Sequence, residues 1–267
     1  MGTRIDRKFD ELKKCGRKGF VAYITAGDPS LKATADIVWR LEDAGADIVE
    51  LGIPFSDPLA DGRVNQASSE RSLAAGTTMD GVLSCVSNIR RKSDVPILFF
   101  SYLNPLEAYG MEQLAKRSSS SGVDGFLILD LPVEEGRVHR DILSSYGLNH
   151  VCLVTPTSPE ARLKRIVNNS NGFIYGVSRT GVTGMQSRLE RDASALMKLA
   201  RKYTNTPLAL GFGISTAAQA GEAAMMADAV VVGSAIVDRF NKEGNSARGR
   251  ARAAAWTKKM IDAVKEV

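Results

Sequence analysis

The chain has 267 residues, of which 44% are hydrophobic, and its formal net charge is +5. This length suits a single α/β barrel of roughly 250 residues and suffices to bury a core without disulfides or structural metals. No apolar stretch approaches the roughly 20 residues of a membrane-spanning helix. Residues 1–18 are charged and polar, so we expect no signal peptide. We expect a cytoplasmic protein with a single domain over residues 1–267.

The positive charge is dispersed along the chain. Denser basic runs lie at 90–92 and among the arginines of 248–252. Neither run contains the interleaved aromatic side chains of a nucleic-acid platform. Solvated helix faces are the better interpretation, and we expect no nucleic-acid partner.

The cysteines and histidines give no sign of a metal site. Cys15, Cys85 and Cys152 are odd in number and lack metal-ligand spacing, which predicts reduced thiols that act as small buried hydrophobes. His139 and His150 fall on a predicted helix and at a predicted strand start, without a neighbouring ligand. We therefore expect no metal.

Eight short apolar runs, rich in β-branched or aromatic residues, recur through the chain. Continuous apolar runs of this length are typical of strands that are buried on both faces, as in a parallel sheet. The predicted strands are 19–25, 47–51, 96–102, 125–130, 150–155, 172–177, 207–211 and 228–233.

Helical patterns separate these runs. Asp28-Pro29 predicts a helix with Asp28 as N-cap and Pro29 at its first position, and Ser158-Pro159-Glu160 repeats this opening. Glycines that precede strands are expected to end helices in the left-handed conformation. These glycines are Gly45, Gly122 and Gly147.

The alternation of strand and helix predicts the fold. Eight strands with intervening helices in about 260 residues favour a closed (β/α)₈ barrel over an open doubly wound sheet. Two additions are expected: an N-terminal helix with Ile5, Phe9 and Leu12 on one face, and a helical insert after the second strand at 66–75.

In such a barrel the active site lies at the carboxyl ends of the strands. Glu50 stands there, at the end of the otherwise apolar second strand. Burying a carboxylate is costly unless it is paired, protonated or catalytic. A structural salt bridge at the barrel rim is the alternative interpretation.

The loop at 53–62 follows Glu50 and contains two prolines and two aspartates. Prolines restrict a loop to few conformations, which suits a loop that presents a side chain. On local chemistry alone, a plain turn is the better interpretation of Asp61-Gly62, and Asp57-Pro58 has the same ambiguity.

Three glycine-rich segments lie late in the chain, at 179–184, 211–216 and 233–235. Glycines let backbone N–H groups approach an anion, and a helix N-terminus adds its dipole. Because barrels commonly bind phosphate with the loops after strands seven and eight, these segments together predict a phosphate site.

Residues 50–62 read Glu-Leu-Gly-Ile-Pro-Phe-Ser-Asp-Pro-Leu-Ala-Asp-Gly. This stretch closely resembles the signature of the tryptophan synthase alpha subunit family. The resemblance continues in order over nearly the whole chain. Its further motifs lie at 25–29, 104–105, 130–132, 156–159, 177–184 and 211–216.

The resemblance implies the reversible retro-aldol cleavage of indole-3-glycerol phosphate to indole and glyceraldehyde 3-phosphate. It assigns proton transfer to Glu50 and pairing with the indole N–H to Asp61. It implies an indole pocket and a phosphate cradle. For each residue of these two sites, packing in the barrel without a binding role is the alternative interpretation. These residues are Tyr23, Tyr102, Leu127, Tyr175 and Phe212 around the indole, and Gly184, Gly213, Gly233 and Ser234 at the phosphate.

The resemblance further implies that this chain has no cofactor of its own. The expected partner is a beta subunit that carries pyridoxal phosphate, in an α2β2 complex. A stand-alone lyase, and an interaction protein that mainly activates a partner, are alternatives. Arg63 and Leu129 replace prolines that are common in the family, and Asn65 stands where an apolar residue is frequent.

Overall fold

The computed structural model describes residues 2–177, 186–211 and 213–267, and it confirms the predicted barrel. Eight parallel strands close on themselves in chain order, with β1 paired to both β2 and β8. Each lies within two residues of its predicted position. The strands are β1 (Gly19–Thr25), β2 (Ile48–Gly52), β3 (Ile97–Ser101), β4 (Gly125–Ile128), β5 (Asn149–Val154), β6 (Ile174–Val177), β7 (Leu208–Gly211) and β8 (Ala229–Val232).

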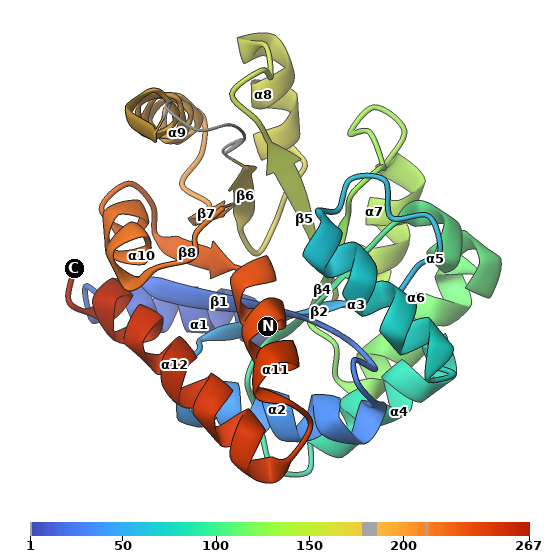
Figure 1. The fold of residues 1–267 in the computed structure, drawn as a ribbon. Helices are drawn as coiled ribbons and strands as arrows, with labels where there is room; N and C mark the ends of the chain where they lie inside the picture. Colours follow the sequence, from blue (N-terminus) through green and yellow to red (C-terminus); the bar gives the residue numbers. More distant parts are fainter. Residues whose placement is uncertain (1, 178–185, 212) are drawn as a thin grey trace.

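Helices surround the barrel (Figure 1). The last helix, α12, runs along the outside and contacts α2, α10 and α11. No helix in the described ranges is long and apolar enough to cross a membrane. The helices are α1 (Arg4–Lys14), α2 (Leu31–Asp43), α3 (Arg63–Ala74), α4 (Met79–Ile89), α5 (Leu103–Tyr109), α6 (Met111–Ser121), α7 (Arg137–Ser145), α8 (Glu160–Asn168), α9 (Gln186–Arg201), α10 (Ala217–Ala224), α11 (Ser234–Glu243) and α12 (Ala247–Lys265).

The inner surface of the barrel is a packed core. Side chains that alternate along a strand point to opposite faces, so every second strand residue reaches the interior. Val21, Ile48, Leu98 and Val151 are among the inner residues, and each is at most 1% exposed. The other face of each strand packs against the helices in a second, larger apolar cluster.

Helix α1 confirms the predicted N-terminal addition and covers the amino-terminal end of the barrel. Its buried residues Ile5, Phe9 and Leu12 belong to the inner cluster. Thr3 and Asp6 form a capping box, in which each side chain bonds the other residue's backbone N–H. The helix is therefore fixed both by apolar contact and at its first turn.

Helix α3 is the predicted insert after β2, and it begins three residues earlier than expected. Its buried residues are serines: Ser68, Ser69 and Ser72. The Ser68 hydroxyl lies 2.6 Å from the Thr25 hydroxyl, and the Ser72 hydroxyl donates to the Ala26 carbonyl at 2.5 Å. Hydrogen bonds thus hold α3 over the carboxyl end of β1.

The predicted helix starts were wrong by one or two residues. Helix α2 begins at Leu31, and its N-cap is Ser30, whose hydroxyl accepts from Ala33 N at 3.2 Å. Asp28 is not the cap because its carboxylate accepts two hydrogen bonds from Arg71, at 2.9 and 2.7 Å. Likewise, Pro159 precedes α8 as its N-cap residue.

The three glycine turns are confirmed, with φ angles of 105°, 94° and 70° at Gly45, Gly122 and Gly147. Two expectations about side chains were wrong. Cys15 is exposed, whereas Cys85 and Cys152 are buried. Arg90 does not lie on a solvated face, because its side chain is 11% exposed and pairs with Asp124.

Candidate active site

Glu50 is buried inside the barrel near the end of β2, two residues after the inner residue Ile48. Its side chain is 0% exposed. Neither carboxyl oxygen has a hydrogen-bond partner within the described part of the chain. Burial raises the pKa of Glu50 to about 8, because a charged carboxylate would lose its water without compensation. The group therefore keeps its proton at neutral pH.

Asp61 lies at the end of the loop that follows β2. The Tyr102 hydroxyl donates to Asp61 Oδ2 at 3.2 Å and accepts from Ala60 N at 2.9 Å. Burial raises the pKa of Asp61, and the hydrogen bond from Tyr102 offsets part of this rise. Unlike Glu50, this carboxyl group has a donor that favours its charged form.

Tyr23 lies close to both carboxyl groups. It pairs with Glu50 in the register of β1 and β2. Burial raises the pKa of Tyr23, and the charges of Asp61 and Glu50 raise it further. Burial also raises the pKa of Tyr175, and the charge of Glu50 raises it further. The predicted pair Glu50 and Asp61 is therefore brought into one cluster with the predicted residues Tyr23, Tyr102 and Tyr175.

Two glycines make room for the tyrosine rings, a role that the sequence did not reveal. A Cβ at Gly52 would lie 2.3 Å from the Tyr23 hydroxyl oxygen. A Cβ at Gly211 would lie 2.5 Å from the Tyr175 hydroxyl oxygen. Side chains at these positions would displace the rings, so both glycines shape the cluster.

Two aromatic residues that the sequence reading missed also belong to this end of the barrel. Phe100 packs edge-on against Tyr23, with ring centroids 5.1 Å apart. Phe55 packs against Tyr102 at 5.4 Å. The alternation of Leu98 and Phe100 on one strand face was the available signal.

The predicted pocket residue Leu127 is 0% exposed and belongs to the inner cluster of the barrel.

Three of the four predicted phosphate residues follow the adjacent strands β7 and β8. Gly213 follows β7 with a φ angle of 70°, and Gly233 and Ser234 form the N-terminus of α11 after β8. Because β7 and β8 are paired, these loops leave the barrel side by side. The remaining two predicted residues, Gly184 and Phe212, lie outside the described residues.

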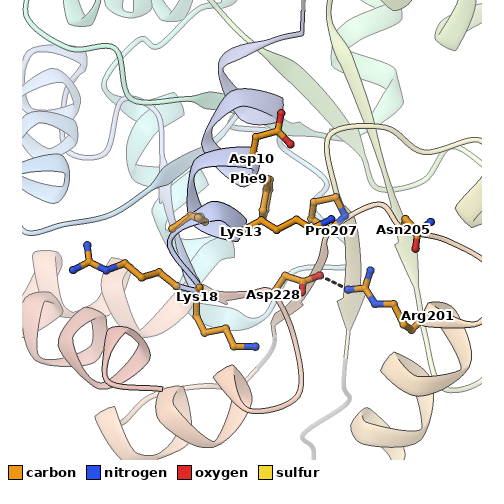
Figure 2. A pocket seen from close by; sticks show the side chains of 11 residues that line it. Phe9, Asp10, Lys13, Lys18, Arg201, Asn205, Pro207 and Asp228 are labelled. Carbon is orange, nitrogen blue, oxygen red and sulfur yellow. Dashed lines mark hydrogen bonds and ion pairs between the residues drawn. The ribbon is translucent and has the colours of Figure 1, made fainter.

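A hollow of about 320 Å³ lies at the opposite end of the barrel (Figure 2). Lys13 of α1 and Lys18 line it together with the ion pair between Arg201 and Asp228. Asp228 immediately precedes β8, so this hollow is at the amino-terminal ends of the strands. It does not contain the predicted site.

Both histidines have polar neighbours, which their sequence positions did not suggest. His139 Nε2 lies 2.6 Å from Glu107 Oε1, and His150 Nδ1 lies 3.4 Å from Cys152 Sγ. Burial lowers the pKa of His150 to about 4 and raises that of Cys152 to about 11. The buried pair is therefore neutral at pH 7.

Comparison with known proteins agrees with this arrangement. The family model described as tryptophan synthase alpha chain matches residues 9–265. The alpha chain of Caldanaerobacter subterraneus subsp. tengcongensis is 49% identical over 243 residues, which cover 91% of this chain and 92% of that one. The alpha subunit structure from Legionella pneumophila str. Paris has a TM-score of 0.90 at 33% identity and covers 100% of both chains.

A second similar structure comes from the tryptophan synthase α2β2 complex of Pyrococcus furiosus, with a TM-score of 0.83 at 31% identity. It covers 92% of this chain and 99% of the other. Sequence, fold and full-length coverage thus agree. The chain belongs to the tryptophan synthase alpha chain family and is a lyase that cleaves indole-3-glycerol phosphate to indole and glyceraldehyde 3-phosphate.

Proposed function

We propose that Glu50 and Asp61 perform the cleavage, each in a different protonation state. The observation that carries this proposal is the environment of Glu50, which is fully buried and unpartnered among the described residues. Its pKa of about 8 makes it a proton donor at neutral pH. Two carboxyl groups in different environments can thus keep different protonation states at the same pH, one neutral and one ionised.

Glu50 carries out both proton transfers in this proposal. It first donates its proton to C3 of the indole, which makes the ring a leaving group. The resulting carboxylate then accepts the proton of the side-chain hydroxyl. The carbonyl of glyceraldehyde 3-phosphate forms as the carbon–carbon bond breaks. The electrons of the broken bond return to the indole ring. Glu50 ends the cycle protonated, as it began.

Asp61 acts in its ionised form. Protonation at C3 withdraws electrons from the indole nitrogen, so a carboxylate that accepts the N–H hydrogen bond stabilises the positive charge as it develops. The Tyr102 hydroxyl, 3.2 Å from Oδ2, supports the ionised state. Its bond to Ala60 N also fixes the loop that carries Asp61.

The remaining predicted residues bind the two ends of the substrate. Tyr23, Tyr102, Tyr175, Leu127 and Phe212 surround the indole in this proposal. Backbone N–H groups at Gly184, Gly213, Gly233 and Ser234 hold the phosphate. The first N–H groups of α11 support this assignment, because helix N–H groups at this position have no partner within the helix and the helix dipole favours an anion.

We propose a cytoplasmic α2β2 complex in which this chain needs no cofactor and the beta subunit carries pyridoxal phosphate. The similarity to a chain of the Pyrococcus furiosus α2β2 complex supports a beta partner. So does Leu59, whose apolar side chain is 91% exposed on the same loop as Asp61. A partner that covers Leu59 would contact the loop that carries a catalytic group.

Titration of beta subunit into the chain tests this assembly, with lyase assays on the same mixtures. We expect beta to raise lyase turnover, and glycerol 3-phosphate to tighten beta binding, because coupling between two binding sites is reciprocal. Identical turnover and affinity in all mixtures would leave the stand-alone lyase. Turnover only trace-level with beta, together with activation of beta by this chain, would favour the interaction protein.

A further inference from the structure

Three buried hydroxyl groups form a chain at the carboxyl end of β1. The Tyr23 hydroxyl lies 3.4 Å from Thr25 Oγ1, which lies 2.6 Å from Ser68 Oγ. Ser68 Oγ in turn donates to the Asn65 carbonyl at 2.8 Å. Tyr23, Thr25 and Ser68 are each at most 5% exposed. The chain therefore joins a side chain inside the barrel to helix α3, away from water.

The last member of the chain sets the direction of every hydrogen bond in it. A carbonyl oxygen only accepts, and each hydroxyl has one proton to donate. Because Ser68 gives its proton to Asn65, Thr25 is the donor to Ser68 and Tyr23 is the donor to Thr25. The reverse direction would leave the bond to the Asn65 carbonyl unmade. The chain thus holds the Tyr23 proton on Thr25, the only partner of this hydroxyl in the described part of the chain.

The Tyr23 hydroxyl lies beside Glu50. Tyr23 and Glu50 are register partners on the paired strands β1 and β2. Residues two apart on a strand share a face, so Gly52 is the next inward position after Glu50. A Cβ at Gly52 would lie 2.3 Å from the Tyr23 hydroxyl oxygen. The hydroxyl thus lies over the inward position next to Glu50, yet neither carboxyl oxygen of Glu50 has a hydrogen-bond partner among the described residues.

A hydrogen bond donated to Glu50 would work against its proposed role. A donor stabilises the ionised form of a carboxyl group and so lowers its pKa. We propose that Thr25 and Ser68 are positioning residues: they engage the Tyr23 proton and thereby leave Glu50 without a donor. The proposal rests on the role of proton donor given to Glu50 above.

The other titratable groups around Glu50 fit this assignment. The Tyr102 hydroxyl donates to Asp61 Oδ2 at 3.2 Å, so its proton is engaged as well. Asp61 is ionised in the proposed mechanism and offers no proton. Tyr175 of β6 makes no hydrogen bond to Glu50. Two of the tyrosines in the cluster, Tyr23 and Tyr102, are therefore held as donors to groups other than Glu50.

The test is the pH profile of kcat/KM, measured with beta subunit present, for wild type and Thr25→Val. Loss of the Thr25 hydroxyl releases the Tyr23 proton to Glu50, which should then ionise at a pH about one unit lower. The basic limb of the profile should shift by the same amount. Above both midpoints kcat/KM should therefore fall about tenfold, and below them it should stay close to wild type.

Four further variants separate this role from a merely structural one. Thr25→Ser keeps the hydroxyl and should restore the wild-type profile. Ser68→Ala should shift the basic limb in the same direction as Thr25→Val, because Thr25 then loses its acceptor and can donate to Tyr23 instead. Tyr23→Phe removes the donor itself, so adding Thr25→Val to it should cause no further shift. Ser72→Ala, the matched control, breaks a different link from α3, the bond to the Ala26 carbonyl at 2.5 Å, and should leave the midpoint of the basic limb unchanged.

Infrared difference spectra against Glu50→Gln measure the protonated Glu50 carboxyl group directly, without turnover. Its ionisation midpoint should fall by about one pH unit in Thr25→Val. An unchanged midpoint would overturn the proposal, as would an equal shift caused by Thr25→Val in the Tyr23→Phe background. Failure of the proposed function has a separate sign: the infrared midpoint would move while the pH profile of kcat/KM stayed as in wild type.

Discussion

Each end of the barrel buries a carboxyl group, but the two groups differ in their hydrogen-bond partners. Asp124, directly before β4, is 3% exposed and accepts from Ile97 N and Arg90 Nη2, both at 2.9 Å. Arg4 of α1 adds a third contact at 3.2 Å. Glu50, at the carboxyl end of β2, is 0% exposed and has no such partner among the described residues.

The difference separates stability from chemistry. At the amino-terminal end, donors surround a buried charge and join α1 to the barrel, so the charge is compensated. At the other end, burial without a donor from the described part of the chain raises the pKa of Glu50 to about 8 and keeps it protonated at neutral pH. A carboxyl group with a full set of partners would be a poor proton donor at this pH. The comparison predicts that changes at the two ends will affect different measurements.

The largest expected effect is on turnover at the carboxyl end. Glu50→Gln keeps the size of the side chain but cannot exchange the proton, so kcat should fall roughly 10²–10⁴-fold. Affinity for glycerol 3-phosphate and the circular dichroism spectrum should stay near wild type. Steady-state assays with beta subunit present measure the change. Near-normal turnover by a folded Glu50→Gln protein would remove Glu50 from the mechanism.

At the amino-terminal end, Asp124→Ala should cost stability instead. Removing one partner of a buried pair leaves Arg90 uncompensated, and such changes cost about 3–5 kcal/mol. Urea unfolding at pH 7 measures the free energy of unfolding. Turnover per folded molecule should remain close to wild type, because Asp124 lies at the other end of the strands. Loss of turnover without loss of stability would break the comparison.

Regular patterns made the barrel predictable from the sequence. Strand burial on both faces and the glycines before strands depend on local composition, and both were confirmed. Glu50 was predictable for the same reason, as a carboxyl group in an apolar strand. Asp61 was not: its Asp-Gly sequence is also ordinary turn chemistry, and only family resemblance singled it out.

Tertiary contacts explain what the sequence could not give. Asp28 was predicted as a helix cap, but Arg71, distant in sequence, binds its carboxylate. Arg90 was expected in solvent because long charged side chains usually are, yet it reaches a buried carboxylate across 34 residues. The need for glycine at position 52 likewise comes from the ring of Tyr23, which lies on another strand.

The free energy of unfolding should depend on pH through Glu50. The pKa of Glu50 is about 8 in the folded chain and near 4.5 in the unfolded one. Between these values the folded state binds more protons, so the free energy of unfolding falls as pH rises and levels off above pH 8. Glu50→Gln lacks this loss. From pH 5 to pH 9 it should gain about 3–5 kcal/mol relative to wild type.

Urea unfolding of both proteins at several pH values measures this gain. Taking the difference between the two proteins removes the titration of Asp61 and of surface groups, which both share. Asp124→Asn is the matched control at the other end, since it also replaces a buried carboxyl group by an amide but leaves Glu50 in place. A constant difference between Glu50→Gln and wild type would mean that Glu50 is already ionised when the protein folds.

The smallest expected effect tests the phosphate end of the same face. A ligand that binds only the folded state stabilises it by about 2.7 kcal/mol at one hundred times its dissociation constant. Glycerol 3-phosphate should therefore raise the Tm of wild type. Ser234→Asp puts a negative charge at the N-terminus of α11, where it repels the phosphate, so the rise should disappear. Ser215→Asp, on the β7 loop but outside the proposed cradle, is the matched control and should keep most of it. Differential scanning calorimetry measures the shifts, and normal stabilisation of Ser234→Asp would require another place for the phosphate.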